Sequence, residues 1–97
     1  MAFDYSSKNR RWKAIRPRIL RRDHFLCREC RRYGRVVAAN VVHHVWPAED
    51  FPEYAYCDWN LVSLCQRCHD AIHDRNTRKL TALGEYWRKK TPPPSGG

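Results

Sequence analysis

The spacing of apolar side chains predicts a helix near the start of the chain. From Asn9 to about Arg22, apolar residues fall at positions i, i+3, i+7 and i+8, namely Trp12, Ile15, Ile19 and Leu20. This spacing places the four side chains on one face of a helix, which we expect to pack against the rest of the protein. Pro17 lies within this segment and has no backbone N–H, so we expect the helix to kink or restart there.

The pattern then changes to short apolar runs. Residues 35–45 read RVVAANVVHHV, a valine-rich run that predicts one or two strands with a turn at Asn40. Residues 46–57 carry two prolines and three acidic residues and predict a loop. The stretch 59-WNLVSLC-65 leads into residues 65–90, which we expect to be mostly helical, with Gly84 as the point where the helix could break. The expected order is helix, cysteine knuckle, β-hairpin, loop and helix, which indicates a small α+β fold.

The length of 97 residues predicts one small domain. We expect residues 1–8 to be a flexible lead-in, residues 9–90 to form the domain, and the Pro/Gly/Ser-rich residues 91–97 to be disordered. A chain of this length buries a modest core, and small domains often add a metal ion or disulfide bonds to stabilise it.

Positive charge is concentrated in one part of the sequence. The formal net charge is +9, and the segment from Lys8 to Arg35 holds 12 of the 19 Lys and Arg residues against two acidic residues. Such a segment is either a solvated surface or a surface that binds the phosphates of a nucleic acid, and the interleaved Trp12 and Tyr33 favour nucleic acid. No segment resembles a sequence-reading module, so we expect weak sequence preference. The candidate phosphate-binding residues are Arg10, Arg11, Lys13, Arg16, Arg18, Arg21, Arg22, Arg67 and Arg75.

The sequence lacks the patterns of a secreted or membrane protein. The Lys/Arg run near the start is not followed by the apolar block of a signal peptide, and no stretch approaches the roughly 18 apolar residues of a membrane span. We therefore expect a soluble, monomeric protein in the cytoplasm. In that reducing compartment, five cysteines are better explained by metal binding than by disulfide bonds.

Four of the cysteines form two pairs with the spacing of a zinc site. Cys27-x-x-Cys30 and Cys65-x-x-Cys68 each allow a tight turn to direct two thiolates at one tetrahedral ion. One such pair would also fit a redox motif, whereas two pairs in a small chain predict a structural zinc. The 34 residues between the pairs are more than a compact zinc finger encloses, so the zinc is expected to hold a further unit together. Cys57 has no partner at this spacing and is expected to be a free thiol.

Four histidines and an asparagine lie in or next to this unit. His43 and His44 are adjacent in a run expected to be extended, so their side chains should leave it on opposite faces. One of them can then bind a metal ion while the other accepts a proton near pH 7. His69 and His73 are four residues apart and would share one face of a helix, where both can bind one ion. Asn60 precedes His69 by nine residues. Either histidine pair alone would also fit a packing or surface role.

Together these motifs resemble the HNH endonuclease family, which has a ββα-metal fold. The resemblance covers about half of the chain, from Cys27 to His73, and rests on 43-HH-44, 60-NLVSLC-65 and 68-CHDAIH-73 with the two cysteine pairs. The segment 12-WKAIRPRILRRDHFLCREC-30 is similar to the start of small phage-type members. Because such members are commonly encoded beside DNA-packaging genes, the resemblance implies a phage origin and a packaging terminase as a partner.

The resemblance also implies a role for each residue. His44 is the expected general base, and Asn60 is expected to hold the hairpin loop and to orient His44 through a hydrogen bond. His43 stands where many members have Asp and, as in colicin-type members, is expected to bind the catalytic metal with His69 and His73. Nitrogen in place of carboxylate oxygen argues against strict dependence on Mg²⁺ and favours Mn²⁺, Ni²⁺, Co²⁺ or Zn²⁺.

The sequence therefore predicts a metal-dependent endonuclease that hydrolyses DNA and leaves a 5′-phosphate and a 3′-hydroxyl. A neutral imidazole can take the proton of the attacking water, and a divalent ion with open positions can stabilise the phosphate transition state and the leaving oxygen. One site per chain favours nicking over double-strand cleavage. Two alternatives stay open: a zinc-stapled module that binds DNA without cleaving it, and an accessory protein that regulates a partner nuclease.

Overall fold

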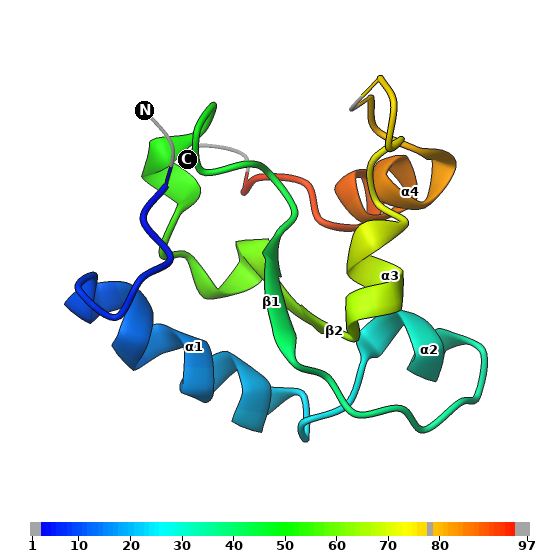
Figure 1. The fold of residues 1–97 in the computed structure, drawn as a ribbon, viewed down its shortest axis with the longest axis horizontal. Helices are drawn as coiled ribbons and strands as arrows, with labels where there is room; N and C mark the ends of the chain where they lie inside the picture. Colours follow the sequence, from blue (N-terminus) through cyan, green and yellow to red (C-terminus); the bar gives the residue numbers. More distant parts are fainter. Residues whose placement is uncertain (1–2, 78, 95–97) are drawn as a thin grey trace.

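A short antiparallel sheet lies at the centre of the structure, with helices packed against both of its faces (Figure 1). The computed structural model describes residues 3–77 and 79–94. The architecture is the predicted small α+β fold. Its elements are α1 (Arg10–Arg22), α2 (Arg28–Arg32), β1 (Val41–His44), the 3₁₀ turns η1 (Pro52–Tyr54) and η2 (Asp58–Asn60), β2 (Leu61–Leu64), α3 (Gln66–Asp70) and α4 (Ala82–Lys90).

Helix α1 follows the predicted apolar pattern. The side chain of Asn9 caps the start of α1, where its Oδ1 atom accepts a hydrogen bond from the backbone N–H of Trp12 at 3.0 Å. The four buried residues of the helix are those of the predicted apolar stripe, Trp12, Ile15, Ile19 and Leu20. The expectation that Pro17 would restart the helix is wrong, because α1 continues for 13 residues. Pro17 lies on the exposed side, so its ring removes one backbone hydrogen bond without disturbing the buried face.

Strand β1 pairs with β2, which is far from it in sequence. The register places His43 opposite Val62 and His44 opposite Leu61. The expected hairpin within residues 35–45 is therefore wrong, since residues 45–60 form a long loop between the two strands. Strand β2 was not predicted, because all four of its residues are buried and no alternation of apolar and polar positions marks them as a strand.

Each face of the sheet carries its own apolar cluster. The cluster on the α1 face consists of Trp12, Ile15, Ile19, Leu20, Val42 and Leu61. The cluster on the other face consists of Cys27, Cys30, Val45, Val62, Leu64, Cys65, Ile72 and Trp87. Because successive strand residues point to opposite faces, this division also separates the two adjacent histidines of β1. His44 lies beside Trp12 of α1, and His43 lies beside His69 of α3.

The segment after Cys65 contains two short helices and not one long helix. Helix α3 ends at Asp70, and α4 begins at Ala82, after a turn that includes the bridge between His73 and Leu80. The hydroxyl of Thr81 donates to the carbonyl of Ile72 at 2.9 Å and accepts from the backbone N–H of Gly84, so it caps α4 and holds the turn. The expected break at Gly84 is wrong, because this residue lies inside α4.

A buried carboxylate connects α2 to α4. Glu29 is 6% exposed and accepts hydrogen bonds from the guanidinium of Arg32 at 2.9 and 3.0 Å. Its Oε1 atom also accepts from the indole N–H of Trp87 at 3.0 Å. The carboxylate therefore has partners on both sides, which offsets the cost of burying its charge.

The ends of the described chain lie outside the helices and strands. Residues 1–2 of the predicted lead-in and residues 95–97 of the predicted disordered tail lie outside the described residues. Residues 91–94 have no regular structure, and the carbonyl of Thr91 accepts a hydrogen bond from the indole of Trp46 at 2.6 Å. Within the described ranges, no helix is long and apolar enough to cross a membrane.

We predict that Gly84→Ala destabilises the protein. A Cβ atom at this position would lie 2.7 Å from the carbonyl oxygen of Ile72 and 2.5 Å from Leu80 Cδ1, so the turn and α4 would have to separate. Overpacking of this kind costs about 1–3 kcal/mol of unfolding free energy. Chemical denaturation should show this loss, whereas Lys89→Ala on the exposed side of α4 should change stability by less than about 0.5 kcal/mol. Equal effects of the two substitutions would contradict the close approach.

Candidate active site

The four paired cysteines come together at the starts of two short helices. Cys27 is the N-cap of α2 and Cys65 is the N-cap of α3, so each pair spans the first turn of a helix. The four sulfur atoms lie within 4.8 Å of one another. Cys30 Sγ is 3.9 Å from Cys65 Sγ and 3.7 Å from Cys68 Sγ. The predicted grouping of the four cysteines is therefore confirmed.

This cluster fits a tetrahedral zinc ion. Zn–S bonds of about 2.3 Å require sulfur atoms to be about 3.8 Å apart, which agrees with the two distances above. Burial raises the pKa of the Cys68 thiol and also that of Cys30, so several thiolates this close together need a cation to balance their charge. Cys57 lies away from the cluster as a free cysteine, as predicted.

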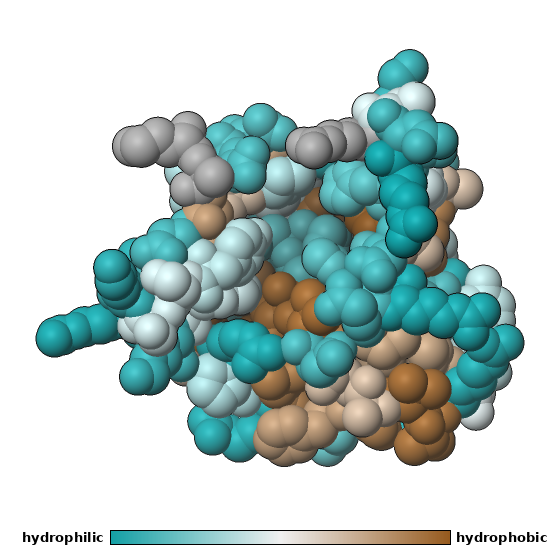
Figure 2. Space-filling view, in the orientation of Figure 1, coloured by the Kyte–Doolittle hydropathy of each residue, from teal (hydrophilic) through white to brown (hydrophobic). Residues whose placement is uncertain are grey.

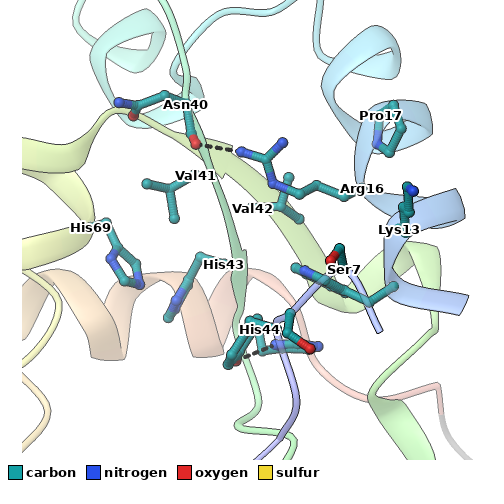
Figure 3. A pocket seen from close by; sticks show the side chains of 13 residues that line it. Ser7, Lys13, Arg16, Pro17, Asn40, Val41, Val42, His43, His44 and His69 are labelled. Carbon is teal, nitrogen blue, oxygen red and sulfur yellow. Dashed lines mark hydrogen bonds between the residues drawn. The ribbon is translucent and has the colours of Figure 1, made fainter. Parts of the chain in front are cut away.

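The imidazoles of His43 and His69 lie edge-on to each other on one side of β1. Their ring centroids are 5.2 Å apart, and His43 is 8% exposed (Figure 3). Burial, with a smaller contribution from the neighbouring imidazoles, lowers the pKa of His43 to about 3. Burial also lowers the pKa of His69, although the carboxylate of Asp70 acts in the opposite direction. Both rings are therefore neutral near pH 7, which is the form that binds a metal ion.

The ring of His44 is held on the opposite side of β1. It stacks on the indole of Trp12, with ring centroids 5.1 Å apart and an interplanar angle of 25°. Its Nε2 atom lies 2.8 Å from the carbonyl oxygen of Ala55, and its Nδ1 atom lies 3.0 Å from the hydroxyl of Tyr5. A carbonyl oxygen can only accept, so Nε2 carries the proton and Nδ1 has the lone pair. Burial lowers the pKa of His44, which favours this neutral form.

Asn60 holds together the two ends of the loop that carries Ala55. Its side chain is fully buried, and its Oδ1 atom accepts from the backbone N–H of Trp46 at 2.7 Å. Its Nδ2 atom donates to the carbonyls of Trp46 and Tyr54 at 3.0 and 3.1 Å. These bonds leave no direct hydrogen bond from Asn60 to His44, so that part of the expectation is wrong. Asn60 instead acts on His44 through the loop that supplies the carbonyl of Ala55.

One cavity brings the two sides of the site together. It has a volume of about 740 Å³ and is lined by His43, His44 and His69, with Lys13 and Arg16 of α1 on its border (Figure 3). Figure 2 shows apolar atoms at the position of β1, in a hollow that hydrophilic residues border. A group that enters this cavity can therefore contact the His43–His69 pair, the ring of His44 and positive charge.

His73 does not share a helical face with His69. It is exposed and follows the end of α3, although its imidazole is close enough to lower the pKa of His43 and that of His69. Within the described part of the chain, the four cysteines form a group of side chains whose metal-binding atoms lie close together, and the histidines do not form such a group. A shared site for His43, His69 and His73 therefore stays a prediction.

The candidate phosphate-binding residues differ in their surroundings. Arg22 donates to Asp23 and to the carbonyls of Asp58 and Leu61, and Arg18 forms an ion pair with Asp58 at 2.6 Å. These two arginines therefore bind other groups of the protein itself. Arg16 is half-buried on the cavity border, where it donates to the carbonyl of Asn40 at 2.7 Å. The other candidates are exposed and are Arg10, Arg11, Lys13, Arg21, Arg67 and Arg75.

Comparisons with known proteins identify the family. The family model described as HNH endonuclease matches residues 27–75, which is just over half of the chain. The chain belongs to the HNH endonuclease family. Strands β1 and β2 with α3 form the ββα core of this HNH endonuclease. The cysteine cluster lies where α2 and α3 begin.

A solved structure resembles this HNH endonuclease beyond the matched segment. It is the crystal structure of the HNH endonuclease of the deep-sea thermophilic bacteriophage GVE2 with manganese ion. The TM-score is 0.63 at 32% sequence identity, over 65% of this chain and 68% of that chain. A comparison with curated proteins gave no match.

The contacts of two residues with His44 were not predicted from the sequence of this HNH endonuclease. Trp12 was recognised as part of an apolar stripe, but nothing in its spacing indicated that its indole would stack on His44. Tyr5 lies in the predicted lead-in, 39 residues from His44 in sequence. Both contacts depend on how α1 and the segment before it pack on the sheet, which local patterns do not encode.

We predict that the four grouped cysteines of this HNH endonuclease bind one zinc ion, which Cys68→Ser removes and Cys57→Ser does not. Loss of one thiolate breaks the four-sulfur set, while Cys57 contributes nothing to it. Metal analysis after removal of loosely bound ions should find about one zinc per chain in the wild type and in Cys57→Ser. Cys68→Ser should have less zinc and a lower thermal midpoint. Equal zinc in both variants would contradict the assignment.

Proposed function

We propose that this HNH endonuclease hydrolyses phosphodiester bonds of double-stranded DNA and leaves a 5′-phosphate and a 3′-hydroxyl. The observation that carries the proposal is the position of His43 and His44 on opposite faces of β1 while both line one cavity. This arrangement lets one histidine bind a metal ion while its neighbour stays free to accept a proton. The family membership of the chain supports the same reaction.

His44 acts as the general base in this proposal. Its protonated nitrogen, Nε2, is bound to the carbonyl of Ala55, so Nδ1 takes the proton of the attacking water. Stacking on Trp12 and the hydrogen bond to Ala55 fix the plane of the ring. Asn60 keeps Ala55 in place by closing the loop, so it is a positioning residue.

His43, His69 and His73 would hold the catalytic divalent ion. Neutral imidazole nitrogens are donors that suit Zn²⁺, Ni²⁺ and Co²⁺, and the manganese of the GVE2 structure supports Mn²⁺ as a further candidate beside Mg²⁺. When bound, such an ion supplies positive charge to the phosphate and to the departing 3′-oxygen. The structure supports His43 and His69 most directly, because their rings already lie next to each other.

Positive side chains on α1 would guide the DNA backbone into the cavity. Lys13 is exposed and Arg16 is half-buried where α1 borders the cavity, so both can reach a phosphate beside the histidines. The exposed Arg10, Arg11 and Arg21 extend this positive surface along α1. Contacts to phosphates carry no sequence information, so the cleavage should have weak sequence preference.

The biological setting of the reaction is also part of the proposal. The similarity to a bacteriophage endonuclease supports a phage origin, with activity in the cytoplasm of a bacterial host beside a packaging terminase. Co-purification with such a motor, and a change in its DNA cleavage on removal of this protein, would test the association.

We predict that wild-type protein nicks supercoiled plasmid when a divalent metal is restored and that His44→Ala does not. Protein cleared of loosely bound metal would receive Mg²⁺, Mn²⁺, Ni²⁺, Co²⁺ or Zn²⁺, with the zinc content of both proteins measured. Loss of a general base lowers the rate by roughly 10²–10⁴-fold. Full nicking by a zinc-loaded His44→Ala would contradict its role as base. Intact plasmid under every metal, with salt-sensitive binding, would instead identify a DNA-binding module that does not cleave.

We predict different effects for Lys13→Ala and Arg22→Ala. Loss of Lys13 should weaken DNA binding and reduce the slope of log affinity against log salt by about one, because one phosphate contact is lost. Loss of Arg22 should lower the free energy of unfolding by about 1–3 kcal/mol, because Asp23 and two carbonyls lose their partner. Binding isotherms at several salt concentrations and denaturation curves would separate the two. The reverse pattern would contradict the division between binding and internal arginines.

A further inference from the structure

The basic nitrogen of His44 already has a partner in the structure. The hydroxyl of Tyr5 donates to His44 Nδ1 across 3.0 Å. This is the lone pair that has to accept the proton of the attacking water, and one lone pair cannot serve both groups. The free protein therefore holds its candidate base in a state in which the base is oriented but not available.

Tyr5 belongs to a segment that lies at the edge of the cavity. Residues Tyr5, Ser6 and Ser7 line the cavity together with the histidines. The ring of Tyr5 lies edge-on against Phe3 and Trp12, with centroids 4.7 and 5.3 Å away. A cavity that has to admit a DNA strand thus has this segment as part of its wall.

The segment is attached by aromatic contacts and a few hydrogen bonds. Tyr5 is 56% exposed, and the backbone around it forms local turns, such as the bond from Ser6 N–H to Asp4 at 2.8 Å. The ring of Phe3 lies 4.9 Å from that of His44 and 5.6 Å from that of Tyr56. Asn9 caps α1, so α1 can keep its place when the residues before Asn9 move.

We propose that the Tyr5 hydroxyl occupies the place of the attacking water and that a DNA strand displaces it when the strand enters the cavity. This inference rests on the proposed function, because it takes His44 as the base. The exchange forms and breaks no covalent bond: the Tyr5 O–H releases Nδ1, and an O–H of water donates to the same lone pair. Tyr5 is thus a residue that competes with the substrate and does not take part in the chemistry.

A proton relay through Tyr5 is the opposite interpretation, and the structure favours displacement. In a relay, the phenol oxygen would have to receive a proton from water while it gives its own to His44. Desolvation of the hydroxyl, which points to His44, raises the pKa of Tyr5, so its O–H is a poor proton donor. The rest of the residue is exposed in the wall of the cavity, which fits a group that leaves.

Tyr5→Phe tests the displacement because it keeps the ring and removes the hydroxyl. Nicking kinetics on plasmid would be measured for the full-length wild type, Tyr5→Phe, His44→Ala and the double variant Tyr5→Phe/His44→Ala. Tyr86→Phe removes the hydroxyl of a tyrosine on α4 outside the cavity, where it accepts a hydrogen bond from Lys90, and is the matched control. We expect kcat/KM of Tyr5→Phe to rise about 2- to 10-fold, since one hydrogen bond no longer competes. The change should lie in KM, with kcat altered less than about twofold and Tyr86→Phe unchanged.

A fall in kcat of Tyr5→Phe would overturn the displacement and support the relay. Unchanged kcat/KM would also overturn it, because the hydroxyl would then not compete. Neither result affects the role of His44, which His44→Ala reports separately: a double variant as inactive as His44→Ala shows that the gain acts through this base. If His44→Ala stays active, the proposed function fails and not only this inference.

Nuclear magnetic resonance of ¹⁵N-labelled histidine gives a second readout that a purely structural role would not move. The Nδ1 resonance of His44 should differ between wild type and Tyr5→Phe in the free proteins, because only the wild type has the Tyr5 hydrogen bond. In complexes with DNA, prepared without the catalytic metal, the two resonances should coincide. A difference that persists in the complexes would show that Tyr5 stays on His44 and would overturn the proposal.

Discussion

The antiparallel pairing of β1 with β2 is the constraint on which the whole site depends. Because successive residues of a strand face opposite sides, this pairing directs His43 toward α3 and His44 toward α1. A shift of the register by one residue would exchange the two rings and would also expose apolar side chains. The buried residues of β2 on both faces resist such a shift, so the placement of the neighbouring histidines on opposite faces is built into the core.

The two faces of the sheet are stabilised by different means, which suits a small domain. On the His43 face, four clustered cysteines hold α2 and α3 against the end of β2. On the His44 face, the apolar side of α1 and the loop closed by Asn60 surround the ring. A chain of this length has too small a core to fix every group by packing alone. The cysteine cluster and the buried amide of Asn60 therefore add the rigidity that a catalytic geometry requires.

Local patterns predicted the parts of the structure that short-range physics controls. The apolar stripe of α1, the grouping of the four cysteines and the divergence of His43 from His44 all follow from spacing and strand geometry. The pairing of β1 with residues 61–64 did not, because a strand buried on both faces has no alternating signal. The end of α3 before His73 was not predicted either. Because the helix ends there, His69 and His73 do not share the helical face expected for two metal ligands. Contacts such as that of Tyr5 depend on packing between distant segments, and one sequence gives no local sign of them.

The most direct test of the account is the affinity for the catalytic metal in His43→Ala and in His44→Ala. Both variants would be cleared of loosely bound metal, keep their structural zinc, and be titrated with Mn²⁺ by calorimetry beside the wild type. The account predicts that His43→Ala loses most of the affinity, whereas His44→Ala binds as the wild type does, although neither cleaves DNA. Equal loss of metal affinity in both variants, or retention in both, would contradict the division of roles across β1.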